Sequence, residues 1–190
     1  MRELQLNTPR LLIGALQAQD CELFCELFTD KRTMQFIGEP LSPARACANF
    51  QAALRRNAQQ PLRQVFCKMV EKTSDRAIGL CSIQRIDRNR RTCEIGLMLT
   101  PHRHRCGFGR ETVVALVDAA FRVFPIGEIS VQYGADNAAV ERLFIGTGFR
   151  PGAHEGADEA GARMRLLSAY RHSWSPPGNA HQLGVHACQM

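Results

Sequence analysis

A strand pattern that passes into a helical pattern through a basic, glycine-containing turn is the feature that most constrains this chain. Residues 94–99 follow a period of two, which predicts a strand. Apolar residues then recur at helical spacing from Val113 to Phe124, and Pro125 ends the pattern. The turn from His104 to Glu111 therefore lies at a helix N-terminus, where free backbone N–H groups and the helix dipole attract anions. Its glycines allow close approach to the backbone, so the pattern predicts a phosphate-binding turn.

The length and composition predict a single domain that does not enter a membrane. A chain of 190 residues with 45% apolar content can bury one substantial core but hardly two. No apolar run approaches the roughly 18 to 20 residues of a membrane span, and residues 1–5 lack the apolar segment of a signal peptide. We therefore expect a soluble, cytoplasmic protein.

The eight cysteines are scattered along the chain and do not form a recognisable framework. Without an export signal they are expected to be reduced and mainly buried thiols. Cys21 and Cys25 lie one helical turn apart, but no second pair of metal ligands accompanies them at a suitable spacing. No metal site is expected.

The net charge of +6 is carried almost wholly by arginine, because Lys31, Lys68 and Lys72 are the only lysines. Arginine suits phosphates and carboxylates. The densest arginine cluster, at 85–91, fits a hairpin turn with solvated charges, and a role in binding a partner is the alternative. No aromatic residues interleave with this cluster and no nucleic-acid-binding motif is present, so a nucleic-acid partner is not expected.

The order of the remaining patterns predicts an α+β domain. Strands are expected at 10–13, 65–71, 77–86, 92–99 and 128–133, with two more starting at Phe149 and Arg163. Helices are expected after Asp20, from Ser42-Pro43 to Asn57, after the turn at 104–111, and from a cap at Asp136-Asn137 to Gly146 or Gly148. The strands between 65 and 99 form an antiparallel meander. From Ser175 onward no apolar period continues, which predicts a domain over 1–174 and a flexible tail over 175–190.

Taken in order, five short motifs resemble the RimJ/RimL type of the GNAT acetyltransferase superfamily, from about Leu6 to Trp174. They are Thr8-Pro9-Arg10-Leu11, Ile78-Gly79, Glu94-Ile95-Gly96-Leu97, Gly107-Phe108-Gly109-Arg110-Glu111, and Asn137-Ala138-Ala139-Val140-Glu141-Arg142-Leu143 leading to Gly148-Phe149. The resemblance implies the GNAT fold, a mixed, mostly antiparallel twisted sheet of six to seven strands flanked by about four helices. Its fourth and fifth strands are parallel and splayed. A homodimer is compatible with the resemblance.

The resemblance also implies acetyl-coenzyme A (acetyl-CoA) as the phosphate ligand, with its pyrophosphate on the turn and its pantetheine arm beside the strand at 92–99. The implied cofactor-binding residues are Leu97, Met98, Leu99, His104, Arg105, Cys106, Gly107, Phe108, Gly109, Arg110, Asn137 and Arg142. His104 stands where the family often has glutamine or arginine, and Arg103, Arg105 and Arg110 could compensate. A dinucleotide fingerprint lacks its third glycine here, and a nucleoside triphosphate loop lacks Gly-Lys-Ser/Thr.

Acyl transfer to an amine requires a proton acceptor, a polarised thioester and a proton for the departing thiolate. Strand parity places Ile95, Leu97 and Leu99 on one face and Glu94 on the other. Glu94 is the candidate base, with a structural ion pair to an arginine as the alternative. By resemblance, the backbone N–H near Met98 or Leu99 holds the thioester carbonyl.

Val140 stands where RimL-type members often have a serine that protonates the sulfur, and valine cannot donate a proton. Tyr133 is the candidate acid, with water as the alternative. Asn137 is expected to cap a helix and, by resemblance, to contact the pantetheine arm.

The expected acceptor is a protein or peptide N-terminus. An α-amino group with a pKa of roughly 7.7 to 8.0 needs less help from a base than a lysine near 10.4. A small-molecule amine is the alternative acceptor, and a non-catalytic module that binds acyl-CoA is a third alternative. The loop at 154–161 carries three carboxylates that could attract a cationic amine, although a solvated surface loop is the simpler interpretation.

Overall fold

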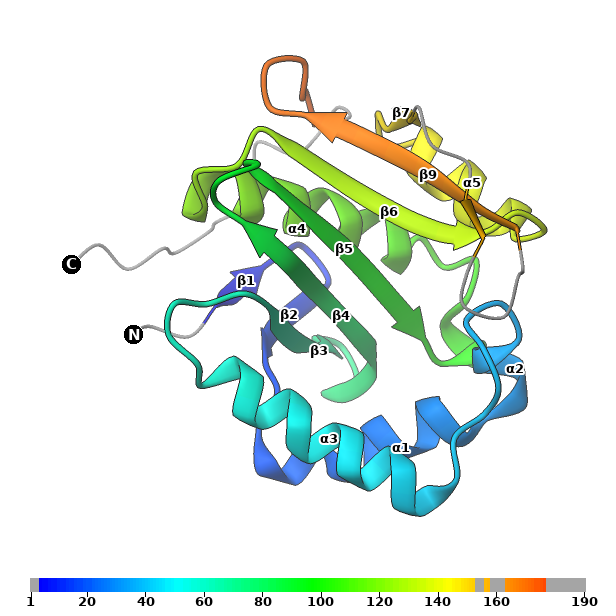
Figure 1. Ribbon diagram of the computed structural model, residues 1–190. Coiled ribbons are helices and arrows are strands. Elements are labelled where there is room, and N and C mark those ends of the chain that lie inside the picture. The colour runs from blue at the N-terminus through cyan, green and yellow to red at the C-terminus, as the bar shows by residue number, and fades with distance from the viewer. Residues whose placement is uncertain (1–3, 153–155, 158–162, 177–190) are drawn as a thin grey trace.

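One twisted sheet organises the chain, in a computed structural model that describes residues 4–152, 156–157 and 163–176 (Figure 1). Its strands are β1 (Gln5–Asn7), β2 (Leu11–Ala15), β3 (Val65–Glu71), β4 (Arg76–Asp87), β5 (Thr92–Leu99), β6 (Glu128–Gly134), β7 (Arg150–Pro151), β8 (Gly156–Ala157) and β9 (Arg163–Tyr170). The order is β1-β2-β3-β4-β5-β6-β9-β7, with β8 also paired to β9.

All neighbouring strands are antiparallel except β5 and β6, which are parallel. The predicted mixed, mostly antiparallel class is therefore confirmed, as is the meander of β3, β4 and β5. The described part of the chain contains nine strands, where six to seven were expected. The two strands beyond the seven expected are β1 and β8, which have only three and two residues, too few to show a period in the sequence.

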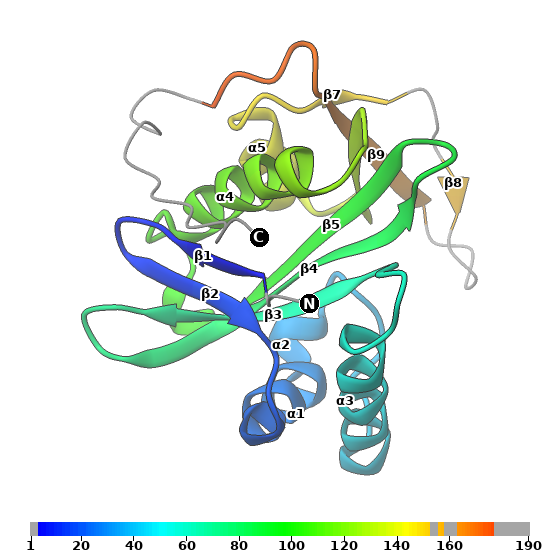
Figure 2. The ribbon, with the colours of Figure 1, turned by 90° about the vertical axis from the view of Figure 1, so that its left-hand side faces the viewer.

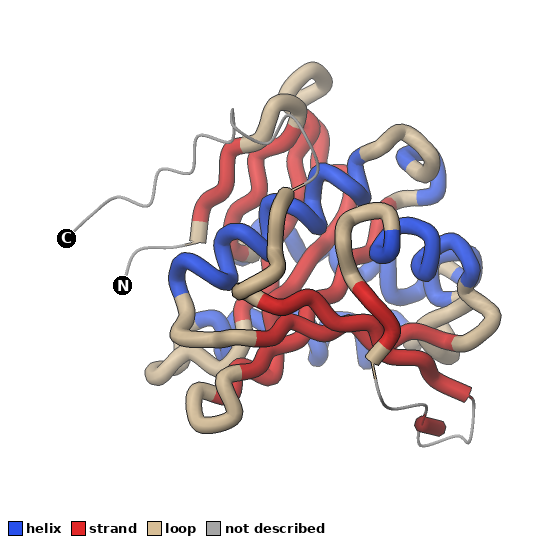
Figure 3. The backbone as a smooth tube through the Cα atoms, turned by 90° about the horizontal axis from the view of Figure 1, so that it is seen from above, coloured by secondary structure: helices blue, strands red, loops and turns tan. Residues whose placement is uncertain are grey.

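The helices lie on both sides of the sheet (Figure 2). They are α1 (Cys21–Thr29), α2 (Lys31–Met34), α3 (Pro43–Asn57), α4 (Phe108–Val123) and α5 (Ala138–Ile145), with short 3-10 helices at Ala18–Asp20 and Pro101–Arg103. Helices α1 to α3 cover one face and α4 and α5 the other. The twist brings β2 and β9 to opposite sides of α4 (Figures 2 and 3). In the described ranges no helix is long and apolar enough to cross a membrane.

Two predicted caps begin helices as expected. The Ser42 hydroxyl accepts a hydrogen bond from the Arg45 backbone N–H at 3.3 Å, and Pro43 follows as the first helical residue. The Asn137 side-chain oxygen accepts from the Val140 N–H at 3.2 Å and starts α5. Both side chains satisfy backbone donors that have no acceptor within the helix.

Two apolar cores meet at β5. The larger core lies between the sheet and helices α4 and α5, and Leu97 and Leu99 pack against it. The smaller core joins α1 and α3 to β3 and β4 around Phe24 and Phe50, whose ring centroids are 5.5 Å apart, and Met98 packs against it. The predicted strand parity is therefore confirmed, and successive residues of β5 face different environments.

All seven cysteines in the described residues are free thiols, but fewer are buried than expected. Cys67, Cys81 and Cys93 are buried, whereas Cys47 is exposed on α3 and Cys106 is exposed in the turn before α4. The sulfur atoms of Cys21 and Cys25 lie 4.0 Å apart on α1. Among the residues that the structure describes, no group of three or more His, Cys, Asp or Glu side chains could hold a metal ion.

Candidate active site

The parallel strands β5 and β6 pair over only three residues and then diverge (Figure 1). The pairs are Thr92 with Glu128, Cys93 with Ile129, and Glu94 with Ser130. Past Glu94 the described register contains no further pair between these strands, although β5 continues to Leu99. The predicted splay is therefore present, and it begins at Glu94.

The ladder between β4 and β5 determines which backbone groups face the diverging strands. The Thr100 N–H donates to the Ile78 carbonyl at 2.9 Å, and the register from Gly79–Leu99 to Gln84–Glu94 is regular. Antiparallel residues direct their backbone groups alternately toward one neighbour and the other. Met98 therefore directs its N–H toward β4, whereas Leu97 and Leu99 direct theirs toward β6, beyond the last ladder pair.

The turn before α4 leaves several backbone donors without an acceptor in the helix. Gly107 is the N-cap with φ +82°, Arg105 has φ +60°, and no side chain caps the helix. The first hydrogen bond of α4 runs from the Glu111 N–H to the Gly107 carbonyl, at 3.2 Å. The N–H groups of the residues before it, from Phe108 to Arg110, therefore have no acceptor within the helix. Such an end attracts anions.

Side chains from the β1–β2 connection hold this turn in place. Glu111 accepts hydrogen bonds from the Thr8 hydroxyl at 2.5 Å and from Arg10 Nε at 2.7 Å. Arg10 also donates to the Cys106 carbonyl at 2.9 Å, and its guanidinium lies 4.5 Å from the centre of the Phe108 ring. Burial would raise the pKa of the Glu111 carboxyl, but the bonds from Thr8 and Arg10 outweigh burial and keep this pKa below its ordinary value.

The basic side chains of the turn differ in their surroundings. The His104 ring Nε2 lies 3.0 Å from the Leu99 carbonyl, which ties the turn to the end of β5. Arg103 is engaged in an ion pair with Glu71 at 2.8 Å. Arg105 and Arg110 are exposed at the turn, and their guanidinium groups are the better placed to meet an anion there.

The turn, β5 and α5 converge at Gly109. A methyl group on Gly109 would lie 3.2 Å from Cδ2 of Leu143 on α5 and 3.8 Å from Cδ1 of Leu97 on β5. Asn137 uses its side-chain oxygen as a helix cap, which leaves the amide nitrogen for other contacts, and Arg142 is exposed on α5. The structure thus brings together the three segments predicted to bind the cofactor.

Glu94 lies on the opposite face of the sheet from the turn. It is only 8% exposed, and its Oε1 accepts from Arg85 Nη1 at 3.0 Å. Burial raises the pKa of the Glu94 carboxyl above its ordinary value, and the Arg85 charge offsets part of that rise. The structural ion pair that the sequence left as an alternative is therefore present, and the carboxylate lies beside the point where β5 and β6 diverge.

Tyr133 lies on the face that carries α4 and α5. It is 5% exposed and belongs to the larger core. Burial and then the charge of Glu141 raise the pKa of the Tyr133 hydroxyl, while Arg165, which pairs with Glu141 at 3.1 Å, counteracts them. The two candidate catalytic side chains therefore approach the diverging strands from opposite faces.

An apolar segment next to α2 borders the Glu94 face. Phe36 and Ile37 are large, exposed apolar residues, and the Phe36 carbonyl would lie 3.8 Å from a methyl group on Gly134 at the end of β6. Sequence reasoning missed this segment, because α2 has only four residues and no apolar period. Most of the acidic loop at 154–161 lies outside the described residues.

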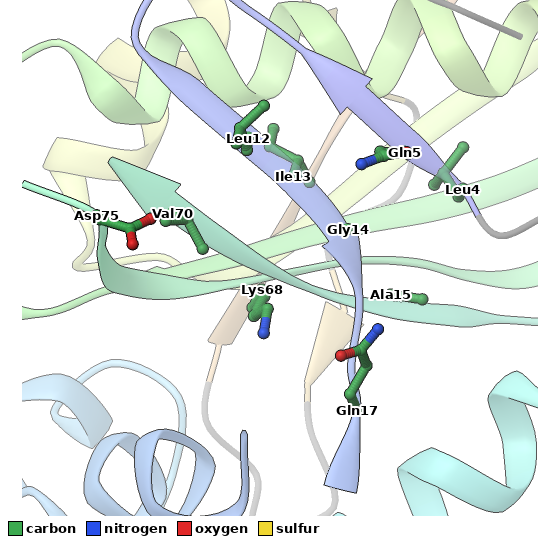
Figure 4. A pocket seen from close by; sticks show the side chains of 10 residues that line it. All are labelled: Leu4, Gln5, Leu12, Ile13, Gly14, Ala15, Gln17, Lys68, Val70 and Asp75. Atoms are coloured by element: carbon green, nitrogen blue, oxygen red, sulfur yellow. The ribbon is translucent and has the colours of Figure 1, made fainter. Parts of the chain in front are cut away.

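A shallow pocket elsewhere on the sheet does not contribute to this site (Figure 4). It lies over β1, β2 and β3, where Leu12 faces Val70 across the ladder. Its lysine, Lys68, is engaged by Asp20 at 2.7 Å. The pocket contains none of the residues at the turn or beside Glu94.

The chain belongs to the GNAT family, because the sequence pattern of the acetyltransferase (GNAT) domain matches residues 10–150. It is an acyltransferase.

Two bacterial relatives carry the name N-acetyltransferase. YoaA of Bacillus subtilis (strain 168), an uncharacterized N-acetyltransferase, is 25% identical over 149 residues, which cover 76% of this chain and 82% of the relative. The uncharacterized N-acetyltransferase p20 of Bacillus licheniformis is 23% identical over 171 residues, which cover 88% of this chain and 94% of the relative.

Solved structures share the fold. The spermidine N-acetyltransferase from Vibrio cholerae, solved with CoA and spermine, has a TM-score of 0.74 at 16% identity, covering 86% of this chain and 96% of that chain. RimL, a ribosomal L7/L12 α-N-protein acetyltransferase solved with coenzyme A, has a TM-score of 0.76 at 13% identity, covering 89% and 98%. These neighbours act on different classes of amine.

Proposed function

We propose that this protein transfers an acetyl group from acetyl-CoA directly to a primary amine, with a protein or peptide N-terminus as the acceptor. The observation that carries the proposal is the uncapped start of α4 beside the unpaired edge of β5. One element offers backbone donors to an anion, and the other offers backbone donors to an extended, amide-containing chain. Acetyl-CoA contains both a pyrophosphate and such a chain.

The proposed donor site uses backbone more than side chains. The N–H groups from Gly107 to Arg110 would hold the pyrophosphate, with positive charge from Arg105 and Arg110. The N–H groups of Leu97 and Leu99 would bind the pantetheine arm and the thioester carbonyl. The Asn137 amide and Arg142 would contact the ligand from α5.

In the proposed reaction the amine nitrogen attacks the thioester carbon, and the carbon–sulfur bond then breaks. Glu94 accepts the amine proton, directly or through a water molecule, on the face away from the turn. Tyr133 lies on the face of the turn and supplies the proton to the departing thiolate. Its raised pKa keeps the hydroxyl protonated, as a proton donor requires.

The surroundings of Glu94 favour an α-amino acceptor over a polyamine. Arg85 already pairs with Glu94, and the cross-strand neighbours Gln84 and Ser130 are uncharged. These described neighbours of Glu94 therefore offer no second carboxylate to the additional ammonium groups of a polyamine. The exposed apolar side chains of Phe36 and Ile37 border the same face and suit the first residues of a peptide. A small molecule with one amine and an otherwise uncharged structure fits the same surroundings and is the second candidate acceptor.

A thiol-release assay with acetyl-CoA tests the proposal across short peptides with free N-termini, polyamines and small amines. We expect the peptides to give the highest kcat/KM. Preference for a small amine or polyamine would contradict the proposed acceptor, and tight binding of acetyl-CoA without turnover would contradict the proposed activity.

Glu94→Gln should lower kcat/KM about tenfold to a hundredfold near pH 7, where most α-amino groups are protonated, and less above pH 8. An unchanged pH profile would remove Glu94 from the mechanism.

A further inference from the structure

We propose that Arg85 is a positioning residue for the transfer reaction, holding the Glu94 carboxylate ionised and fixing one of its oxygens so that the other faces the acceptor. This inference rests on the proposed function, in which Glu94 accepts the amine proton. Sequence reasoning placed Arg85 in a solvated hairpin cluster and did not assign it to the site.

A local irregularity of β4 directs Arg85 toward Glu94. The ladder with β5 is regular up to the pair Gln84–Glu94, and the register then shifts before Asp87 pairs with Thr92. In a regular strand, Arg85 and Gln84 would point to opposite faces. The bulge and a left-handed backbone at Arg85, with φ +52°, bring its guanidinium to the Glu94 side. Non-glycine residues hold this conformation only where their surroundings impose it.

The guanidinium reaches across the point at which the sheet divides. Arg85 Nη1 lies 3.0 Å from Glu94 Oε1 on β5 and 3.5 Å from Gln132 Oε1 on β6. Glu94 belongs to the last pair between β5 and β6, and Gln132 lies two residues beyond its partner Ser130. Arg85 therefore engages one oxygen of the Glu94 carboxylate, Oε1, from the hairpin side.

Among the residues that the structure describes, Arg85 is the charged group that acts on Glu94. The cross-strand neighbours Gln84 and Ser130 are uncharged, as is Gln132, and the helices on this face contribute the apolar side chains of the smaller core. The adjacent Cys93 belongs to the core on the other face, where burial and then the Glu94 charge raise its pKa to about 12 and keep it neutral. Since burial raises the pKa of Glu94 and Arg85 lowers it, removing the guanidinium must raise it further.

A second arginine of the same hairpin provides a matched control. Arg90 pairs with Asp87 at 3.8 Å, and its side chain is 84% exposed, compared with 69% for Arg85. Both substitutions remove one positive charge from the hairpin, but only Arg85 contacts Glu94. A general effect of net charge would appear in both variants.

The test compares Arg85→Gln, Arg85→Lys and Arg90→Gln with the wild-type protein by NMR titration of the glutamate carboxyl carbons, with Glu94→Gln identifying the Glu94 signal. Because Arg85 is largely exposed, we expect its loss to move the Glu94 titration upward by about half to one pH unit. Arg85→Lys should move it less, and Arg90→Gln should leave it unchanged. In Arg85→Gln the rise of kcat/KM on the acid side of the pH profile should shift upward together with the Glu94 titration. At pH values below this rise, kcat/KM should be about three- to tenfold lower than in the wild type, and at high pH it should recover. The KM for acetyl-CoA should not change.

An unchanged Glu94 titration in Arg85→Gln, or an equal shift in Arg90→Gln, would overturn the inference. So would an Arg85→Gln variant whose kcat/KM falls equally at every pH. Failure of the wild-type protein to acetylate any acceptor would instead contradict the proposed function. The carboxyl titration separates these results, because it requires neither an acceptor nor turnover.

Discussion

At the residue scale, the two proposed catalytic side chains work from opposite faces of one sheet. Glu94 pairs with Ser130 on the face of α1 to α3, whereas Tyr133, three residues further along β6, belongs to the core under α4 and α5. Glu94 would accept a proton on the side of the amine substrate, and Tyr133 would donate one on the side of the cofactor. This arrangement suits a reaction in which the amine and the departing thiolate lie on opposite sides of the carbonyl carbon.

Tyr133→Phe tests the proton donor, since it removes only the hydroxyl. We expect kcat to fall about tenfold or more while the dissociation constant of acetyl-CoA stays the same. Tyr170→Phe is the control, because the Tyr170 ring lies beside His172, with centroids 5.8 Å apart, at the far end of β9. Equal rates of thiol release in the two variants would indicate that water, and not Tyr133, protonates the departing thiolate.

Gly107→Ala tests the cofactor turn. The residue has φ +82°, and a methyl group on it would lie 3.2 Å from Nη2 of Arg10, so alanine would strain the turn. We expect the dissociation constant of coenzyme A, measured by calorimetry, to rise about five- to tenfold. Gly14→Ala on β2 is the control, because a methyl group there meets nothing within 4 Å. Unaltered coenzyme A binding in Gly107→Ala would argue against the turn as the phosphate site.

At the element scale, the connection between β1 and β2 holds the start of α4. Arg10 bonds both Glu111 and the Cys106 carbonyl, so two segments about a hundred residues apart in sequence fix the shape of the turn. This explains physically why the Thr8-Pro9-Arg10 motif accompanies the glycine turn. The motif supports the turn through these bonds.

The Glu111 anchor should make stability depend on pH. Its folded-state pKa is lowered, so its contribution is fully present above the unfolded value near 4.3 and is lost as pH falls through the folded value. We expect urea unfolding to show a large difference in unfolding free energy between wild type and Glu111→Gln above about pH 5, and a smaller one below about pH 4. Glu22→Gln, at an exposed site on α1, controls for charge. A difference that stayed constant with pH would contradict the anchor.

Elements with strong local signals were predictable from sequence. Ser42 and Asn137 cap their helices through bonds that span three residues, so local sequence was enough to find them. The meander followed from period-two patterns. Arg85 was not predictable as a site residue, because its direction depends on a register shift between two strands and on a carboxylate nine residues away. The segment with Phe36 was missed because only its contact with β6 gives it a role.

At the scale of the whole molecule, the segment after β9 closes back onto α4. The Trp174 ring N–H donates to Asp118 at 2.6 Å, and the ring lies 6.4 Å from Phe121 and 6.3 Å from Phe149 between centroids. These contacts join the last described residues to the larger core. The proposed domain limit at 174 falls at this residue, while residues 177–190 of the expected tail lie outside the described residues.

Trp174→Ala should lower the unfolding free energy by about 2 to 3 kcal/mol, because a half-buried ring and its hydrogen bond are both lost. A chain that ends after residue 176 should unfold like the full-length chain. Urea denaturation of the three proteins measures both effects. Strong destabilisation by the truncation alone would place the domain limit beyond 174.

The brief pairing of β5 and β6 has a mechanical consequence. In the described register only three ladder pairs connect β5 of the five-strand half of the sheet to β6 of the other half, and the backbone of β5 beyond them has spare bonding capacity. A ligand lying between these edges would act as a temporary strand and couple the two halves. The protein with ligand bound should be more rigid between β5 and β6 than the free protein, and release of the product should restore the flexibility of the free protein.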